Sequence, residues 1–477
     1  MATSAANGHG SRSPDNSRAR LVRGSISGHL VRQTTPAIVG VAAIMSVGVI
    51  DAYFIGQLGA RELAAISFIF PVTTALQSLG VGVMVGINSV VSRALGEGDD
   101  ERALARANLG LLLGLVAGIT LGLLLFALRQ PLFQLMQADA DILPLIDQYM
   151  RPYALGFVLM MTMMGANGVL RGQGAAKSNT AVLLIYSAVN WILDPLLITG
   201  GFGIEGFGVA GAAYATIGGW LVAIFAAFWL LERHDLPLRP SAVKNCRIGV
   251  QLKALTRVAG PAAFTNSINP AGLAILTSLL AAEGSAAVAG FGAGGRLQSF
   301  AVVPLLALSG SIGAIVGQNW GAQQHERARR ALVQAGLFCL GYGLAAALVL
   351  YSFRDWFAAL FSDEARTLEA TTSYLALSVW GYAAYGILIV VNGALNAIDR
   401  AANALALSLS RVLLVMVPFA WLLRGALGTQ AVYLAELAAN VLGGLAAAAI
   451  AWWVLWKRPG EAGSAGDAEA ASVERTA

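Results

Sequence analysis

Two aspartates stand in stretches of sequence that are otherwise apolar enough to cross a membrane. Asp51 follows an uncharged run that begins at Pro36, and Asp194 lies in the segment NWILDPLL. A charged side chain inside the hydrocarbon core costs about 2.5–3.5 kcal/mol, so such residues usually serve transport. The alternative for Asp51 is a hydrogen-bonded packing role at a helix bend. We expect Asp51 to face protein or a watery cavity rather than lipid.

Three further polar side chains can join these carboxylates. Asn190 lies four residues before Asp194, so the two share one face of a helix. Pro195 lacks a backbone donor and should bend this helix, leaving carbonyl oxygens free. Thr216 and Asn167 lie in the neighbouring apolar segments.

A cluster of two carboxylates, two amides and a hydroxyl suits a proton or a small hard cation. Two nearby carboxylates repel when both are ionised, so at least one is expected to take up a proton near neutral pH. Sodium could bind at Asp51, Asn190 and Asp194. We predict no other metal site and no cofactor, because the four histidines lack ligand spacing. The alternative is a polar network that only fixes helix packing.

The composition of the 477-residue chain indicates a polytopic membrane protein. Hydrophobic residues make up 57% of the chain and charged residues only 12%, whereas about a quarter of the residues of a soluble protein are charged. We find twelve apolar segments long enough to span a bilayer. They lie at 36–57, 64–92, 104–128, 142–170, 180–200, 207–231, 251–281, 286–316, 328–353, 370–396, 402–423 and 428–456. The predicted fold is all-α.

The two halves of the chain repeat each other. Without a gap, an offset of 225 residues pairs Pro36 with Pro261, Gly96 with Gly321, and the tripeptide at 101–103 with that at 326–328. Because six spans per repeat is an even number, the two bundles should be related by a pseudo-two-fold axis along the membrane normal. We therefore predict a tail at 1–34, a first lobe at 35–232, a linker at 233–250, a second lobe at 251–456 and a tail at 457–477.

The repeat is chemically asymmetric. At the 225 offset, Leu276 stands where the first half has Asp51, and Phe419 where it has Asp194. No carboxylate falls within 254–282 or 370–396. We therefore expect the coupling chemistry in the first lobe. Arg296 and Arg411 also lie in apolar stretches, and the sequence assigns them neither partners nor a role.

Candidate residues for a substrate cavity also lie in the first lobe. Met160, Met161 and Met164 form a polarizable patch that could accommodate varied apolar ligands, although ordinary packing explains it equally well. Gln77 and Tyr153 add polar groups. No ATP-binding module or catalytic motif is present, so we do not expect an enzyme.

Four motifs resemble, in this order, the multidrug and toxic compound extrusion (MATE) family. They are DAYFIGQLG from Asp51, SRALGEGD from Ser92, NWILDPLL, and GQNWGAQQHERAR from Gly317. The resemblance covers residues 30–456. It implies twelve helices in two lobes arranged as a V, and export of organic cations and other drugs in exchange for protons or sodium.

The resemblance also implies site residues. Asp51, Asn190, Asp194 and Thr216 match cation-binding positions of the DinF-like branch of the family, and Asn167 is added with a looser match. The NorM-like branch has acidic residues in its seventh and tenth helices, and this chain has none there. Their absence favours the DinF-like branch.

Our functional prediction is a multidrug efflux antiporter for lipophilic or cationic small molecules, coupled to protons or sodium. A flippase for lipid-linked sugars and a membrane scaffold or sensor are the alternatives. The basic residues gather in alternate loops, which places both termini in the cytoplasm. The composition fits a bacterial inner membrane. We expect small molecules and membrane lipid as partners, and neither nucleic acid nor an obligate protein partner.

Overall fold

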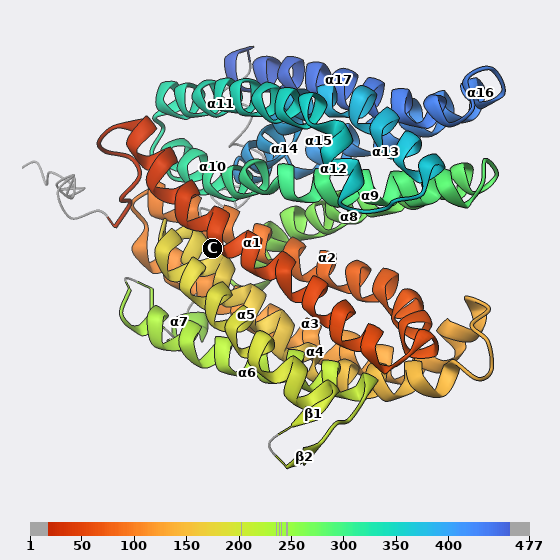
Figure 1. Cartoon of the computed structure of the whole chain (residues 1–477). Helices are drawn as coiled ribbons and strands as arrows, with labels where there is room; N and C mark the ends of the chain where they lie inside the picture. Colours follow the sequence, from red (N-terminus) through yellow and green to blue (C-terminus); the bar gives the residue numbers. More distant parts are fainter. Residues whose placement is uncertain are drawn as a thin grey trace, which may run out of the picture.

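The computed structural model describes residues 18–457, except 202, 235, 238, 240, 245 and 246. Within these residues the chain is almost entirely helical, and the helices form two groups that follow each other in the sequence (Figure 1). Residues 18–234 build the first group, the N-lobe, and residues 247–457 build the second, the C-lobe. The predicted all-α polytopic fold is confirmed.

Six long helices form the N-lobe. They are α1 (Ile26–Leu58), α2 (Ala60–Gly96), α3 (Asp100–Leu135), α4 (Leu143–Gly172), α5 (Ala176–Ile198) and α6 (Val209–Glu232). A two-stranded antiparallel ribbon between α5 and α6, β1 (Gly200–Gly201) with β2 (Ile204–Glu205), pairs Gly200 with Glu205. The short helix α7 (Ser241–Lys244) lies between the lobes in sequence.

The C-lobe also has six spans, but most of them are interrupted. Unbroken helices are α8 (Ile248–Ala281), α11 (His325–Ser352) and the short α12 (Arg354–Ala359). The other spans join α9 (Ser285–Ala301) to α10 (Val303–Gly321), α13 (Ala365–Leu377) through η2 (Ser378–Gly381) to α14 (Tyr382–Ala397), α15 (Ala401–Leu409) through η3 (Ser410–Met416) to α16 (Val417–Leu427), and α17 (Thr429–Trp452) to η4 (Trp453–Lys457). The break between α9 and α10 bends that span by 42°.

All twelve predicted spans coincide with helices of the structure. Eleven of them, counting the bent α9–α10 pair as one, are long and apolar enough to cross a membrane. The twelfth, α8, does not reach that hydropathy within the described residues. Its polar residues, which include Asn266 and Asn269, explain the difference. α8 packs against α2 of the other lobe, a position that tolerates polar side chains better than a lipid-facing one.

The sequence repeat is visible in the packing between the lobes. α2 packs on α8 in the same way that α10, its counterpart, packs on α1. At the point where α2 crosses α10, a Cβ on Gly96 would lie 2.1 Å from the carbonyl oxygen of Gln318. A Cβ on Gly321 would lie 2.2 Å from the carbonyl oxygen of Arg93. The four residues are equivalent pairs at the 225 offset, so the pseudo-two-fold axis passes through this crossing.

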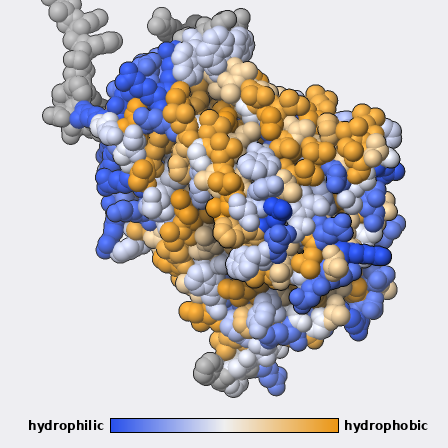
Figure 2. All heavy atoms as spheres, turned by 45° about the horizontal axis from the view of Figure 1, so that its top comes forward, coloured by the Kyte–Doolittle hydropathy of each residue, from blue (hydrophilic) through white to orange (hydrophobic). Residues whose placement is uncertain are grey.

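The outer surface suits a lipid environment. On α3, Leu112, Leu115, Val116, Ile119 and Leu123 are all exposed along one stripe. Figure 2 shows hydrophobic residues over much of the visible face, with hydrophilic residues gathered toward its margins. Because a soluble protein rarely exposes apolar patches of this extent, the chain is an integral membrane protein.

The ends of the lobes differ from their predicted boundaries. α1 begins at Ile26, inside the segment predicted as an N-terminal tail at 1–34, and Leu21 before it is already buried. Residues 1–17 of that tail and residues 458–477 of the second tail lie outside the described residues. The predicted linker at 233–250 contains α7 and the first residues of α8.

Candidate functional site

The Asp51 and Asp194 side chains meet inside the N-lobe. α1 carries Asp51 and packs against α5, which carries Asp194. The two carboxyl groups lie within hydrogen-bonding reach of each other. Asp194 is fully buried, and neither of its oxygens accepts a hydrogen bond from a described residue; the same holds for Oδ1 of Asp51. The structure thus brings together the two carboxylates that the sequence singled out.

Asn190 adds a third oxygen from the same face of α5. Its Nδ2 donates to the backbone oxygen of Tyr186 over 2.9 Å, which leaves Oδ1 buried and without a described partner. The amide lies directly against Gly219 of α6, where a Cβ would be 2.2 Å from Nδ2. Because Gly219 has no side chain, α6 approaches closely enough to hold this amide in place.

Thr216 reaches the same level of the lobe. It is buried on α6, three residues before Gly219, while Asp194 lies four residues after Asn190 on α5. α5 and α6 are antiparallel neighbours, so a step of four residues on α5 and of three on α6 from the contact of Asn190 with Gly219 places Thr216 near the level of Asp194. Asp51, Asn190 and Asp194 therefore lie together between α1 and α5, and Thr216 lies near their level on α6.

Asn167 lies apart from this cluster. Tyr149 is the residue of α4 that interacts with both carboxylates, and Asn167 follows it 18 residues later on the same helix. At about 1.5 Å per residue the two are roughly 27 Å apart along the axis. Asn167 is fully buried, with no described partner for either side-chain polar atom. The structure does not place it with the acidic pair.

Aromatic side chains lie near the acidic pair. Tyr149 stacks on Tyr153 at 5.5 Å between ring centroids, and Tyr153 meets the edge of Trp220 at 5.3 Å. Tyr186 also interacts with both carboxylates. Tyr153, which we predicted as a substrate-cavity residue, is buried among these aromatic rings in this structure.

The methionine patch belongs mostly to the core. Met160 and Met161 are each 1% exposed, and they pack against glycines of α2 and α3. In this structure they lie in the packed core, which agrees with the alternative of ordinary packing. Met164 is half-buried, and Gln77 is exposed next to the Tyr153 hydroxyl.

The sequence analysis missed a buried carboxylate in the C-lobe. Glu436 of α17 is 2% exposed and accepts a hydrogen bond from Nε2 of Gln298 at 2.5 Å. Arg411, in the π-helix η3, donates to the side-chain oxygens of Asn440 on α17 (2.7 Å) and Asn269 on α8. A single glutamate in the apolar run YLAELAANVL was the available signal. Arg296, by contrast, is exposed on α9.

The lobes are joined at the end of the molecule that carries most of the basic loops. Ser89 of α2 donates to the backbone oxygen of Asn396 at 2.6 Å. Arg93 of α2 lies 3.9 Å from Asp399, which follows α14. Gln318 of α10 is fully buried and donates to the backbone oxygen of Gly172 at 2.9 Å. From this end the two lobes diverge (Figure 1).

Comparison with known proteins agrees with this architecture. The family model described as MatE matches residues 36–196 and 261–422. The chain is 35% identical to the FAD transporter of Shewanella oneidensis over 90% of its own length and 95% of that protein. It is 30% identical to the "Probable multidrug resistance protein NorM" of Deinococcus radiodurans, over 80% of this chain and 84% of that protein.

Solved structures show the same arrangement of helices. A crystal structure of the MATE transporter VcmN of Vibrio cholerae superposes with a TM-score of 0.87 at 29% identity, covering 91% of this chain and 98% of that one. The likeness includes both lobes, so it extends to the helices that build the acidic cluster.

Proposed function

The chain belongs to the MatE family of membrane transporters, and from this premise we propose that it is an antiporter that exports a small organic molecule in exchange for a cation. As a member of this family it is a transporter and not an enzyme. The observation that carries the proposal is the pair of half-buried Asp51 and fully buried Asp194 between α1 and α5, with Oδ1 of Asp51 and both oxygens of Asp194 buried and without a described partner.

The donor set of this cluster supports a proton or sodium as the coupling ion. Buried charges persist only when they are paired or bind a cation. A shared proton would link the two carboxyl groups directly. A sodium ion would find the oxygens of Asp51, Asp194, Asn190 and Thr216, which are ligands that hard cations prefer. The described residues contain no group of three or more histidine, cysteine, aspartate or glutamate side chains that could hold a metal ion.

The place of the cluster suggests how coupling occurs. α1 carries Asp51 and packs against both α5 and the C-lobe helix α10, so it links the cation site to the joint of the lobes. A cation shifts the balance of two states only by binding one of them more tightly. We propose that binding at Asp51 favours release of the exported molecule, which binds when the cation is absent. The unpartnered carboxylates support cation binding in the N-lobe as the step that drives export, as in the DinF-like branch.

The exported molecule is either a drug-like organic compound or a flavin nucleotide. Relatives named as multidrug resistance proteins support the first. The second is supported by the FAD transporter of Shewanella oneidensis, which is 35% identical to this chain. Arg171, which lies between the lobes, adds a positive charge that would suit an anionic molecule.

Flux measured under separate gradients tests the proposal. The protein would be reconstituted into liposomes, and efflux of ethidium or of FAD followed after imposing either a proton gradient or a sodium gradient. We expect one gradient to accelerate transport of at least one of the two molecules. Transport that responds to neither gradient, or no transport at all, would refute an antiporter.

A further inference from the structure

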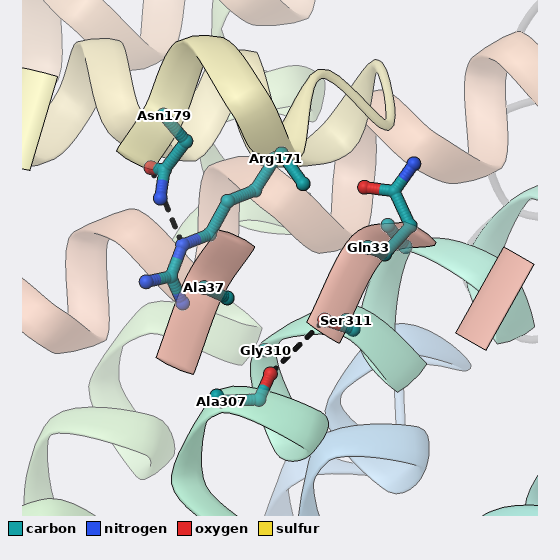
Figure 3. A pocket seen from close by; sticks show the side chains of 9 residues that line it. Gln33, Ala37, Arg171, Asn179, Ala307, Gly310 and Ser311 are labelled. Carbon is teal, nitrogen blue, oxygen red and sulfur yellow. Dashed lines mark hydrogen bonds between the residues drawn. The ribbon is translucent and has the colours of Figure 1, made fainter. Parts of the chain in front are cut away.

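Arg171 occupies a place that the sequence did not indicate. It directly follows the fourth predicted span, 142–170, and it lines a small cavity between the lobes (Figure 3). Gln33 and Ala37 of α1 and Asn179 of α5 lie on the N-lobe side of the cavity, and Gly310 and Ser311 of α10 lie on the C-lobe side. The guanidinium group therefore reaches from one lobe to the other.

Among the described residues, no acidic side chain neutralises this guanidinium group. None of the nine residues that line the cavity is a carboxylate. Arg171 forms no ion pair with a described residue, and its Nε donates to Oδ1 of Asn179 over a long 3.4 Å. A guanidinium group has five N–H donors and fits oxyanions in a planar fork. Most of its donors thus remain for another partner.

The other polar side chains of the cavity are held in place by hydrogen bonds to backbone oxygens. Gln33 binds the backbone oxygen of Gly174 through Nε2 (2.6 Å), which fixes its amide at the rim. Ser311 donates to the backbone oxygen of Ala307 at 3.0 Å. Gly310 provides the room, because a Cβ there would lie 2.6 Å from a terminal nitrogen of Arg171. The absence of a side chain at Gly310 lets the guanidinium group lie flat against α10.

We propose that Arg171, with Asn179 beside it, binds the phosphate or carboxylate group of the transported molecule when the lobes separate at this end. The inference rests on the proposed transport function and adds to it the charge of the substrate. A charge-assisted, bidentate contact of this type gives both affinity and orientation. A lipid phosphate offers the same chemistry, but the cavity lies between α1, α5 and α10 rather than on the lipid-facing surface, which favours the substrate.

Riboflavin and flavin mononucleotide form a matched pair of probes, because they differ by a single phosphate and both fluoresce. Equilibrium binding of each would be measured by fluorescence quenching with the full chain in phosphatidylcholine nanodiscs. We expect Arg171→Gln to weaken binding of flavin mononucleotide by about tenfold or more, the effect of one charge-assisted contact, and binding of riboflavin less than twofold. Arg171→Lys keeps a positive charge and should therefore keep part of the preference for flavin mononucleotide over riboflavin.

Two further variants serve as a control and as a second test of the position of the guanidinium group. Arg61→Gln removes an exposed arginine that pairs with Asp141 at 3.2 Å, and it should change neither affinity. Gly310→Ala displaces the guanidinium group without removing it, and it should reduce the preference for flavin mononucleotide.

The inference would be overturned if wild type did not prefer flavin mononucleotide, or if Arg171→Gln weakened both probes equally. It would also be overturned if phosphatidylglycerol in the nanodisc competed with flavin mononucleotide in wild type but not in Arg171→Gln, since the occupant would then be lipid. Binding is measured without a gradient. Failure of gradient-driven flux would therefore refute the antiporter proposal separately.

Discussion

Because α2 and α10 cross closely, we predict that adding a single methyl group at the crossing changes the ratio of two states of the transporter. In one state the lobes are joined at this end, and in the other they are separated there. A Cβ on Gly96 would lie 2.1 Å from a backbone oxygen of Gln318, and one on Gly321 would lie 2.2 Å from a backbone oxygen of Arg93. Backbone cannot move aside as a flexible side chain can. Gly96→Ala and Gly321→Ala must therefore push the two helices apart at this joint.

Overpacking of this kind costs about 1–3 kcal/mol. The cost applies only to the state in which the lobes are joined here, so each variant should shift the ratio of the two states by about 5- to 150-fold. The end that is open in this structure should then close more often. Gly336→Ala is the matched control, because it is also helical and a Cβ there meets nothing within 4 Å.

Spin labels on the diverging ends of the two lobes provide the assay. Cysteines would be introduced at Arg61 and Asp363, both exposed, with Cys246 and Cys339 replaced. Electron–electron double resonance should show a shorter distance population that grows in Gly96→Ala and Gly321→Ala but not in Gly336→Ala. Unchanged distances in both variants would refute the reasoning that this crossing closes only in the observed state.

Two further predictions concern the C-lobe. Glu436→Leu leaves the buried amide of Gln298 without its 2.5 Å partner and should lower the free energy of unfolding by about 1–3 kcal/mol. The loss would be measured as a lower Tm in detergent. An unchanged Tm would contradict a structural contribution of this contact. Asp399→Asn removes the partly buried ion pair with Arg93 and should favour separation of the lobes at this end in the same spin-label assay. Asparagine tolerates the positive φ of 64° at this position, so no effect on the distances would show that the pair contributes nothing.

The acidic cluster of the N-lobe could be predicted because its chemistry is local. Asn190 and Asp194 share a helix face by their spacing alone, and Asp51 stands out as a single charge in an apolar run. The packing of α1 on α5 then brings them together. Asn167 was grouped with them without such a constraint, and the length of α4 keeps it away.

The C-lobe network and the cavity at Arg171 depend on contacts that no local pattern encodes. The partners of Arg411 come from α8, 142 residues away, and from α17, 29 residues away. Glu436 was not predicted because carboxylates were considered only at 254–282, at 370–396 and at the positions equivalent to Asp51 and Asp194, and Glu436 lies outside all of these. Arg171 resembles an ordinary basic residue at a helix end, and only the junction of the lobes reveals that it is enclosed.

The most direct test of the central claim is to measure ion release when substrate binds to the purified protein. FAD and ethidium would each be added to weakly buffered wild type and Asp51→Asn, with a pH indicator in one experiment and ²²Na⁺ in the other. Wild type should release protons or sodium on binding at least one of the two molecules, while Asp51→Asn should bind the same molecule and release neither. Equal release from both proteins would contradict coupling at the Asp51–Asp194 pair.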